Sequence, residues 1–144
     1  MAEDLTPSEP TLAIATDKVC FIISMARQFD EKEEVSDPDS GSNGADDGMI
    51  DVLEESPDDP VRHQLVSFIR DLDIDEQVEL VALTWLGRGD GDLAEIETLR
   101  SDARDAHTNR TASYLLGIPL LSDYLEEALS LFGESCEAFE AENQ

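Results

Sequence analysis

The sequence predicts an all-α protein: a single compact bundle of about five to seven helices, with a mobile acidic loop after the first helix. Three observations predict this class. Apolar residues recur at the three- and four-residue spacing of a helix along most of the chain. No segment alternates apolar and polar residues as a half-buried strand does. At 144 residues, the chain has the length of one domain.

The first helix is expected to begin near Thr16 or Asp17, whose side-chain oxygens can accept from unpaired amides of the first turn. Its apolar face consists of Val19, Ile22, Ile23, Ala26 and Phe29. Residues 1–15 carry two prolines and no sustained period, so they are expected to form a flexible N-terminal arm.

The composition changes sharply at Asp30. Residues 30–59 contain many acids and a single base, Lys32, and residues 36–48 are rich in Gly, Ser and Asp. Such a segment buries too little apolar surface to offset the entropy of ordering it. We therefore predict a mobile acidic loop at residues 30–48.

Asp59 and Pro60 predict the next helix start, as an N-cap followed by proline at the first helical position. The apolar face of this helix consists of Val61, Leu65, Phe68, Ile69 and Leu72.

A further helix, capped by Asp73 or Asp75, extends to Leu86 and is apolar on most sides. Because a helix that is apolar all round is a buried one, this segment around Trp85 is the predicted centre of the fold. Gly87 and Gly89 are expected to end it.

Asp92 and Glu95 have the spacing of a capping box and open a more polar helix. Its inward residues are expected to be Ile96, Leu99, Ala103 and Ala106. The last strong helix is expected to start at Pro119 and to stop at Gly133. The helical domain thus covers residues 16–133, and residues 134–144 are expected to form an acidic tail that frays.

The charge balance excludes several kinds of partner. The chain has 35 acids and 9 bases, a formal net charge of −26. Phosphate backbones and anionic lipid surfaces would be repelled, so neither nucleic acid nor a membrane is an expected partner. A basic protein is the favoured partner. The oligomeric state is left open.

The two cysteines, Cys20 and Cys136, are too few and too distant in sequence to suggest a disulfide framework. We expect them to be reduced, packed thiols. The N-terminal residues lack the pattern of a signal peptide. Together these observations predict a cytoplasmic protein.

The segment from Arg100 to Arg110 reverses the local charge, because it carries three arginines and His107 against two aspartates. If one helix continues past Ala106, several of these side chains and Tyr114 share a face. Such a face could bind a carboxylate or phosphate. The candidate ligand-binding residues are Arg88, Arg104, His107, Arg110, Tyr114 and Asp123. The alternative is that the arginines are internal counter-charges for the acidic helices.

Metal and catalytic motifs are not found. Calcium-loop spacing fails from Asp37, Asp39 and Asp71, because none of the three has the final Glu and only the loop from Asp39 has the central Gly. No Cys or His pair has zinc-ligand spacing, and no nucleophile elbow or phosphate-binding glycine loop is present. No metal, cofactor or catalytic residue is therefore predicted.

Two stretches are distinctive, residues 76–90 (EQVELVALTWLGRGD) and residues 107–127 (HTNRTASYLLGIPLLSDYLEE). Together they resemble a family of domains of unknown function, number 3775, and the similarity extends over about residues 16–136. The resemblance implies a small cytoplasmic bacterial protein from a family found mainly in alphaproteobacteria, and the family has no established activity to carry over.

Two functions are compatible with these features. The first is a non-enzymatic interaction or regulatory module, whose acidic loop or surface binds a basic partner or whose apolar grooves bind a helix. The second is a protein or enzyme that binds a small anionic ligand through the Arg, His and Tyr residues at 104–114.

Overall fold

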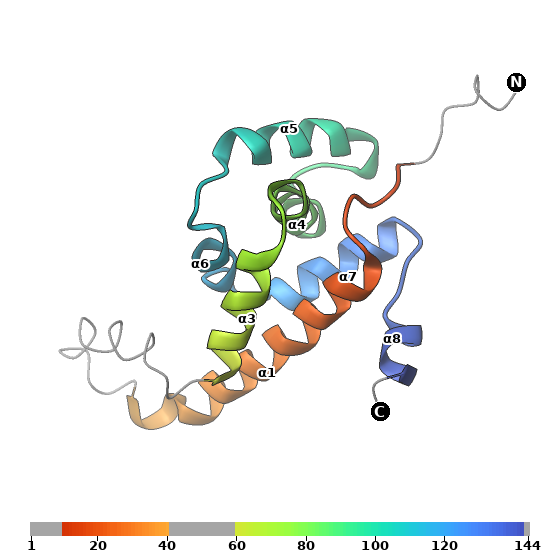
Figure 1. Ribbon diagram of the computed structural model, residues 1–144. Coiled ribbons are helices and arrows are strands. Elements are labelled where there is room, and N and C mark those ends of the chain that lie inside the picture. The colour runs from red at the N-terminus through yellow and green to blue at the C-terminus, as the bar shows by residue number, and fades with distance from the viewer. Residues whose placement is uncertain (1–9, 41–59, 143–144) are drawn as a thin grey trace, which may run out of the picture.

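The computed structural model describes residues 10–40 and 60–142, with only the backbone at residues 30–40. These ranges form seven α-helices, one short 3₁₀ helix and no strand, so the predicted all-α class is confirmed (Figure 1). In chain order the elements are α1 (Thr16–Ser40), α3 (Pro60–Asp71), α4 (Ile74–Arg88), η3 (Leu93–Glu95), α5 (Ile96–Ala106), α6 (Thr111–Leu116), α7 (Leu121–Leu131) and α8 (Glu137–Glu142).

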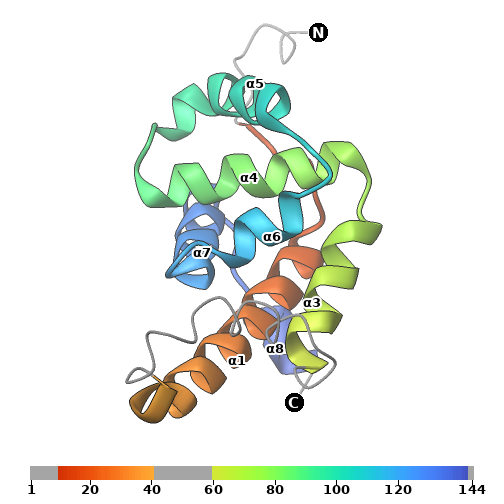
Figure 2. The ribbon, with the colours of Figure 1, turned by 90° about the vertical axis from the view of Figure 1, so that its left-hand side faces the viewer.

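Helix α4 is the centre of the fold, as its composition predicts. It runs between α5 on one side and α6 and α7 on the other (Figure 2). Its buried residues are Val78, Glu79, Leu80, Val81, Ala82, Leu83, Thr84 and Leu86. The buried Thr84 hydroxyl donates to the Leu80 carbonyl at 2.8 Å, which satisfies it inside the helix. Trp85 itself is only partly buried and lies at the edge of the core.

Polar side chains fix the start of α4. Asp73 is the N-cap: its carboxylate accepts from the Glu76 amide, and the Glu76 carboxylate accepts from the Asp73 amide. Glu76 also forms an ion pair of 2.7 Å with Lys18 of α1. The hydrogen bond from Lys18 lowers the pKa of Glu76 below its ordinary value. The start of α4 is thereby tied to the start of α1.

Helix α4 ends two residues later than expected, at Arg88, and the glycines at 87 and 89 have different roles. Gly89 is the C-cap, in the left-handed conformation with φ 97°. Gly87 lies inside the helix, where a Cβ atom would overlap the backbone carbonyl of Tyr124 in α7. The prediction that Gly87 ends the helix is therefore wrong: its missing side chain lets α4 and α7 pack backbone to backbone.

Helix α1 is longer than expected. Its apolar residues pack against α3 and α7, including a tilted contact between Phe21 and Phe68 with ring centroids 4.6 Å apart. The prediction of an acidic loop is wrong for residues 30–40, because α1 continues to Ser40. Residues 31–34 are Glu and Lys, which are good helix formers, and this propensity outweighs the missing apolar face. Residues 41–48 of the predicted loop lie outside the described residues.

The end of the N-terminal arm is held against the fold, so the expectation of a flexible arm up to residue 15 is wrong for its last residues. Ile14 is buried. The Ala13 amide donates to Glu79 at 3.1 Å, and the Thr11 carbonyl accepts from Arg100 at 2.7 Å. Residues 1–9 lie outside the described residues.

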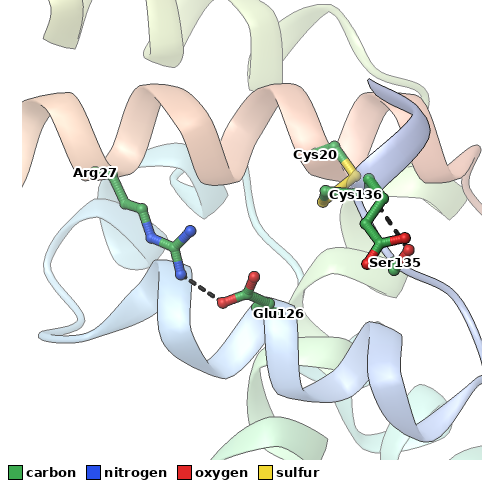
Figure 3. The surroundings of a disulfide bond; sticks show 6 residues. Cys20, Arg27, Glu126, Ser135 and Cys136 are labelled. Carbon is green, nitrogen blue, oxygen red and sulfur yellow. Dashed lines mark hydrogen bonds and ion pairs between the residues drawn. A yellow bond between two sulfur atoms is a disulfide. The ribbon is translucent and has the colours of Figure 1, made fainter. Parts of the chain in front are cut away.

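The C-terminal segment is also held, by a disulfide between Cys20 of α1 and Cys136 (Figure 3). The Cα atoms of this pair are 5.6 Å apart, and both residues are buried. The expectation of reduced thiols is therefore wrong, because the fold brings together two residues that are 116 positions apart in sequence. Of the acidic tail predicted from residue 134, residues 137–142 form α8. None of the helices in the described ranges has the length and apolarity needed to cross a bilayer.

We predict that Gly87→Ala destabilises the protein by about 2 kcal/mol or more, because the added methyl group meets backbone atoms that cannot move aside. The free energy of unfolding in urea measures this change. Gly117→Ala is the matched control, since a Cβ there lies no closer than 3.5 Å to its neighbours. The control should change stability by less than about 1 kcal/mol. Equal effects of the two substitutions would contradict the close approach of α4 and α7.

Candidate functional site

The structure separates the six candidate residues. Arg104 forms an ion pair with Asp75 at 2.9 Å. Asp123 accepts from Arg27 at 3.3 Å, and the same guanidinium donates to Glu126 at 2.6 Å (Figure 3). These two candidates therefore belong to inter-helix ion pairs, as the counter-charge alternative expects.

The shared face predicted for residues 100–114 does not form, because the helix stops. Helix α5 ends at Ala106, and His107 follows in an extended conformation with ψ 136°. A new helix, α6, starts at Thr111. Arg104, before this break, pairs with Asp75, whereas Arg110, after the break, lies beside Arg70. Ala106 is exposed rather than buried, contrary to expectation, while Ile96, Leu99 and Ala103 are buried as predicted.

Arg110 lies beside Arg70 of α3, at an open hollow of about 320 Å³ that Asn109 and Ser113 also line. Arg110 and Arg70 are both exposed. His107 and Tyr114 do not line this hollow, so Arg110 does not share a site with them.

Three of the six candidates, Arg88, His107 and Tyr114, lie around Trp85. The Trp85 indole Nε1 donates to the Tyr114 hydroxyl at 2.9 Å. The Arg88 guanidinium donates to Asp90 at 2.7 and 3.1 Å and also interacts with the Tyr114 hydroxyl. The Asp90 carboxylate is the main cause that raises the pKa of Arg88, and Tyr114 adds to it.

His107 is held by a second polar network. Its Nε2 atom lies 2.8 Å from Oε1 of Gln77. The Gln77 amide nitrogen donates to the carbonyls of Ile69 and Leu72, at 3.0 and 3.2 Å, where α3 ends. Since that nitrogen is the donor, the Gln77 oxygen accepts, and the hydrogen-bond network assigns the imidazole proton to Nε2.

Trp85, His107 and Tyr114 line one pocket of about 230 Å³ between α4, α5 and α6. Val81, Ala103 and Ala106 contribute its apolar part, and the Thr108 and Thr111 side chains also line it. His107 and Tyr114 are the two predicted residues that the structure brings into the same cavity.

The most buried charged group among the described side chains is Glu79 of α4, which sequence reasoning missed. Its side chain is 1% exposed and accepts from Arg100 Nε and Nη2, each at 2.7 Å. Arg100 also donates to the Thr11 carbonyl and to Glu97, and its pKa is raised, chiefly by Glu79. Together with the Ala13 amide, these bonds satisfy the carboxylate. The signal was the one charged side chain within the otherwise uncharged run from Val78 to Leu86, since a buried carboxylate needs a cation.

No three His, Cys, Asp or Glu side chains of the described ranges gather as a group that could hold a metal ion.

The family model described as protein of unknown function (DUF3775) matches residues 62–133, which run from α3 to the glycine after α7. The chain therefore belongs to this family. The match contains α4 and the pocket at Trp85, whereas α1 and both cysteines lie outside it. Neither a curated protein nor a solved structure matches the chain.

We predict that Glu79→Gln lowers the free energy of unfolding by about 2–3 kcal/mol. The change leaves the guanidinium of Arg100, 17% exposed, without its main counter-charge. Glu97→Gln is the control: it removes another carboxylate bonded to Arg100, but one that is 82% exposed. That substitution should cost less than about 1 kcal/mol. Urea titrations of both variants test the difference, and a larger loss in the control would show that Glu79 does not organise this contact.

Proposed function

We propose that the protein is a non-enzymatic interaction module that binds a basic protein partner through its acidic surface. The distribution of charge carries this proposal. At least five of the nine bases form ion pairs with carboxylates of the described residues. They are Lys18, Arg27, Arg88, Arg100 and Arg104. These bases are occupied by carboxylates of the same chain, so they oppose a cationic partner less than unpaired bases would.

One part of the surface gathers exposed carboxylates from two elements. Asp71, Asp73 and Asp75 are exposed where α3 meets α4, and Asp102 and Asp105 are exposed on α5. The ion pair between Arg104 and Asp75 joins α5 to the start of α4. We call these five aspartates the acidic corner.

A hollow of about 390 Å³ adjoins the acidic corner. Asp73, Asp75 and Glu76 line it together with Arg100 and Arg104, which pair with Glu79 and Asp75. Carboxylate oxygens of this kind are suitable acceptors for the Lys or Arg side chains of a partner. The formal charge of −26 would also attract a basic protein over a distance, which raises the association rate more than the final affinity.

A cytoplasmic location is part of the proposal, and the disulfide bears on it. Disulfides are rare in a reducing cytoplasm, so Cys20–Cys136 counts against this location, while the small number of cysteines favours it. Thiol labelling of the protein in its own cells distinguishes the disulfide from two reduced cysteines.

The proposal is tested by capture followed by direct measurement. The tagged protein is incubated with an extract of its own cells at low and high salt, and each retained protein is identified and purified. We expect a basic partner that is retained at low salt and released at high salt, because screening weakens exposed charge pairs.

A charge-matched pair of variants then locates the interface. One variant carries Asp71→Asn, Asp102→Asn and Asp105→Asn, and the other carries Glu134→Gln, Glu137→Gln and Glu140→Gln, all at exposed positions. We expect the first variant to bind the purified partner about tenfold more weakly and the second to bind nearly as the wild type does. Retention of nothing at low salt, or equal weakening by both variants, would contradict the proposal.

A further inference from the structure

The pocket at Trp85 has a chemistry that the acidic surface lacks. The side chains that line its 230 Å³ include neither Asp, Glu, Lys nor Arg. Trp85 and Tyr114 supply aromatic surface, and the hydrogen bond between them fixes their relative position. Small apolar side chains on α4 and α5 complete the apolar part. Mostly apolar walls with a few placed polar groups are typical of small-molecule sites.

The hydrogen bonds of Tyr114 and His107 leave one donor on the first residue and one acceptor on the second. The Tyr114 oxygen accepts from Trp85, so its own hydroxyl proton can still be donated. His107 uses Nε2 toward Gln77, so in the neutral ring the remaining nitrogen, Nδ1, is an acceptor. A ligand with both an acceptor and a donor could therefore bond to both residues.

The charge and the size of the pocket further limit the kinds of ligand that it can bind. Arg104 and Arg110, which the sequence suggested for an anionic ligand, lie elsewhere. Arg88 lies near the Tyr114 hydroxyl, but it does not line the pocket and its guanidinium is paired with Asp90. The net charge of the chain also opposes an anion. The volume lies below the roughly 300–1,000 Å³ of sites for drug-sized ligands, which limits the occupant to about one ring system.

We propose that this pocket is a binding site for a small, neutral, planar ring compound that carries an amide-like pair of hydrogen-bonding groups. The ring packs against Trp85 and Tyr114. Its carbonyl accepts from the Tyr114 hydroxyl, and its N–H donates to His107. This site is independent of the acidic corner and of the partner proposed above.

The experiment uses the full-length protein, because Trp85 is its single tryptophan and its fluorescence reports on this pocket alone. The probes are benzamide, 2-pyridone and uracil, with benzoate as the anionic analogue of benzamide. We expect a saturable change in fluorescence with at least one neutral probe, at a dissociation constant in the millimolar range typical of fragments of this size. Benzoate should bind at least tenfold more weakly than benzamide.

Two pairs of variants separate binding in the pocket from a general effect. Ala106→Leu places a larger side chain at the pocket wall and should abolish the fluorescence change, whereas Ala138→Leu, exposed on α8, should not. Tyr114→Phe should weaken binding about tenfold, while Tyr124→Phe, away from the pocket, should leave it unchanged. Absence of saturation with all three neutral probes, or equal responses in Ala106→Leu and the wild type, would overturn the site. Capture of the basic partner by Ala106→Leu is expected to be unchanged, so the two proposals fail separately.

Discussion

The fold depends on burying α4 on nearly all sides although this helix carries a carboxylate. Glu79 is 1% exposed, and an ionised group in that position is costly unless it is fully paired. Arg100 from α5 and the Ala13 amide supply the partners. Because these partners come from α5 and from the N-terminal segment, α4 can be buried only when both segments are in place. One charge thus joins three parts of the chain around the central helix.

The same logic extends to the whole charge distribution. Basic side chains are used mainly as clamps between elements: Lys18 joins α1 to α4, Arg27 joins α1 to α7, and Arg104 joins α5 to α4. Most of these pairs are exposed, so each contributes little stability by itself. Their placement leaves the acidic corner outside and an uncharged pocket at Trp85. One small domain therefore carries both a negatively charged surface and a pocket lined by uncharged side chains.

Much of the fold is readable from the sequence because local signals agree with the global arrangement. Pro60 correctly predicted the start of α3, and the continuous apolar run after the cap at Asp73 or Asp75 correctly predicted the central helix. Contacts between residues that are far apart in the sequence could not be predicted from it. The apolar pattern marks which face of a helix is buried, but it does not say that Gly87 meets Tyr124 or that Cys20 meets Cys136. The candidate site failed for a local reason: the break at His107 turned one predicted face into several separate contacts.

Amide hydrogen exchange of the full-length protein tests the central role of α4 most directly. Helices that form the last-opening core exchange most slowly, whereas peripheral elements open locally. The structure predicts that the amides of Leu80–Leu83 in α4 are the slowest of the chain and that those of α8 are among the fastest in its helices. Exchange of the α4 amides as fast as that of the α8 amides would contradict an architecture built around α4. The same holds if the slowest-exchanging amides lie in another helix.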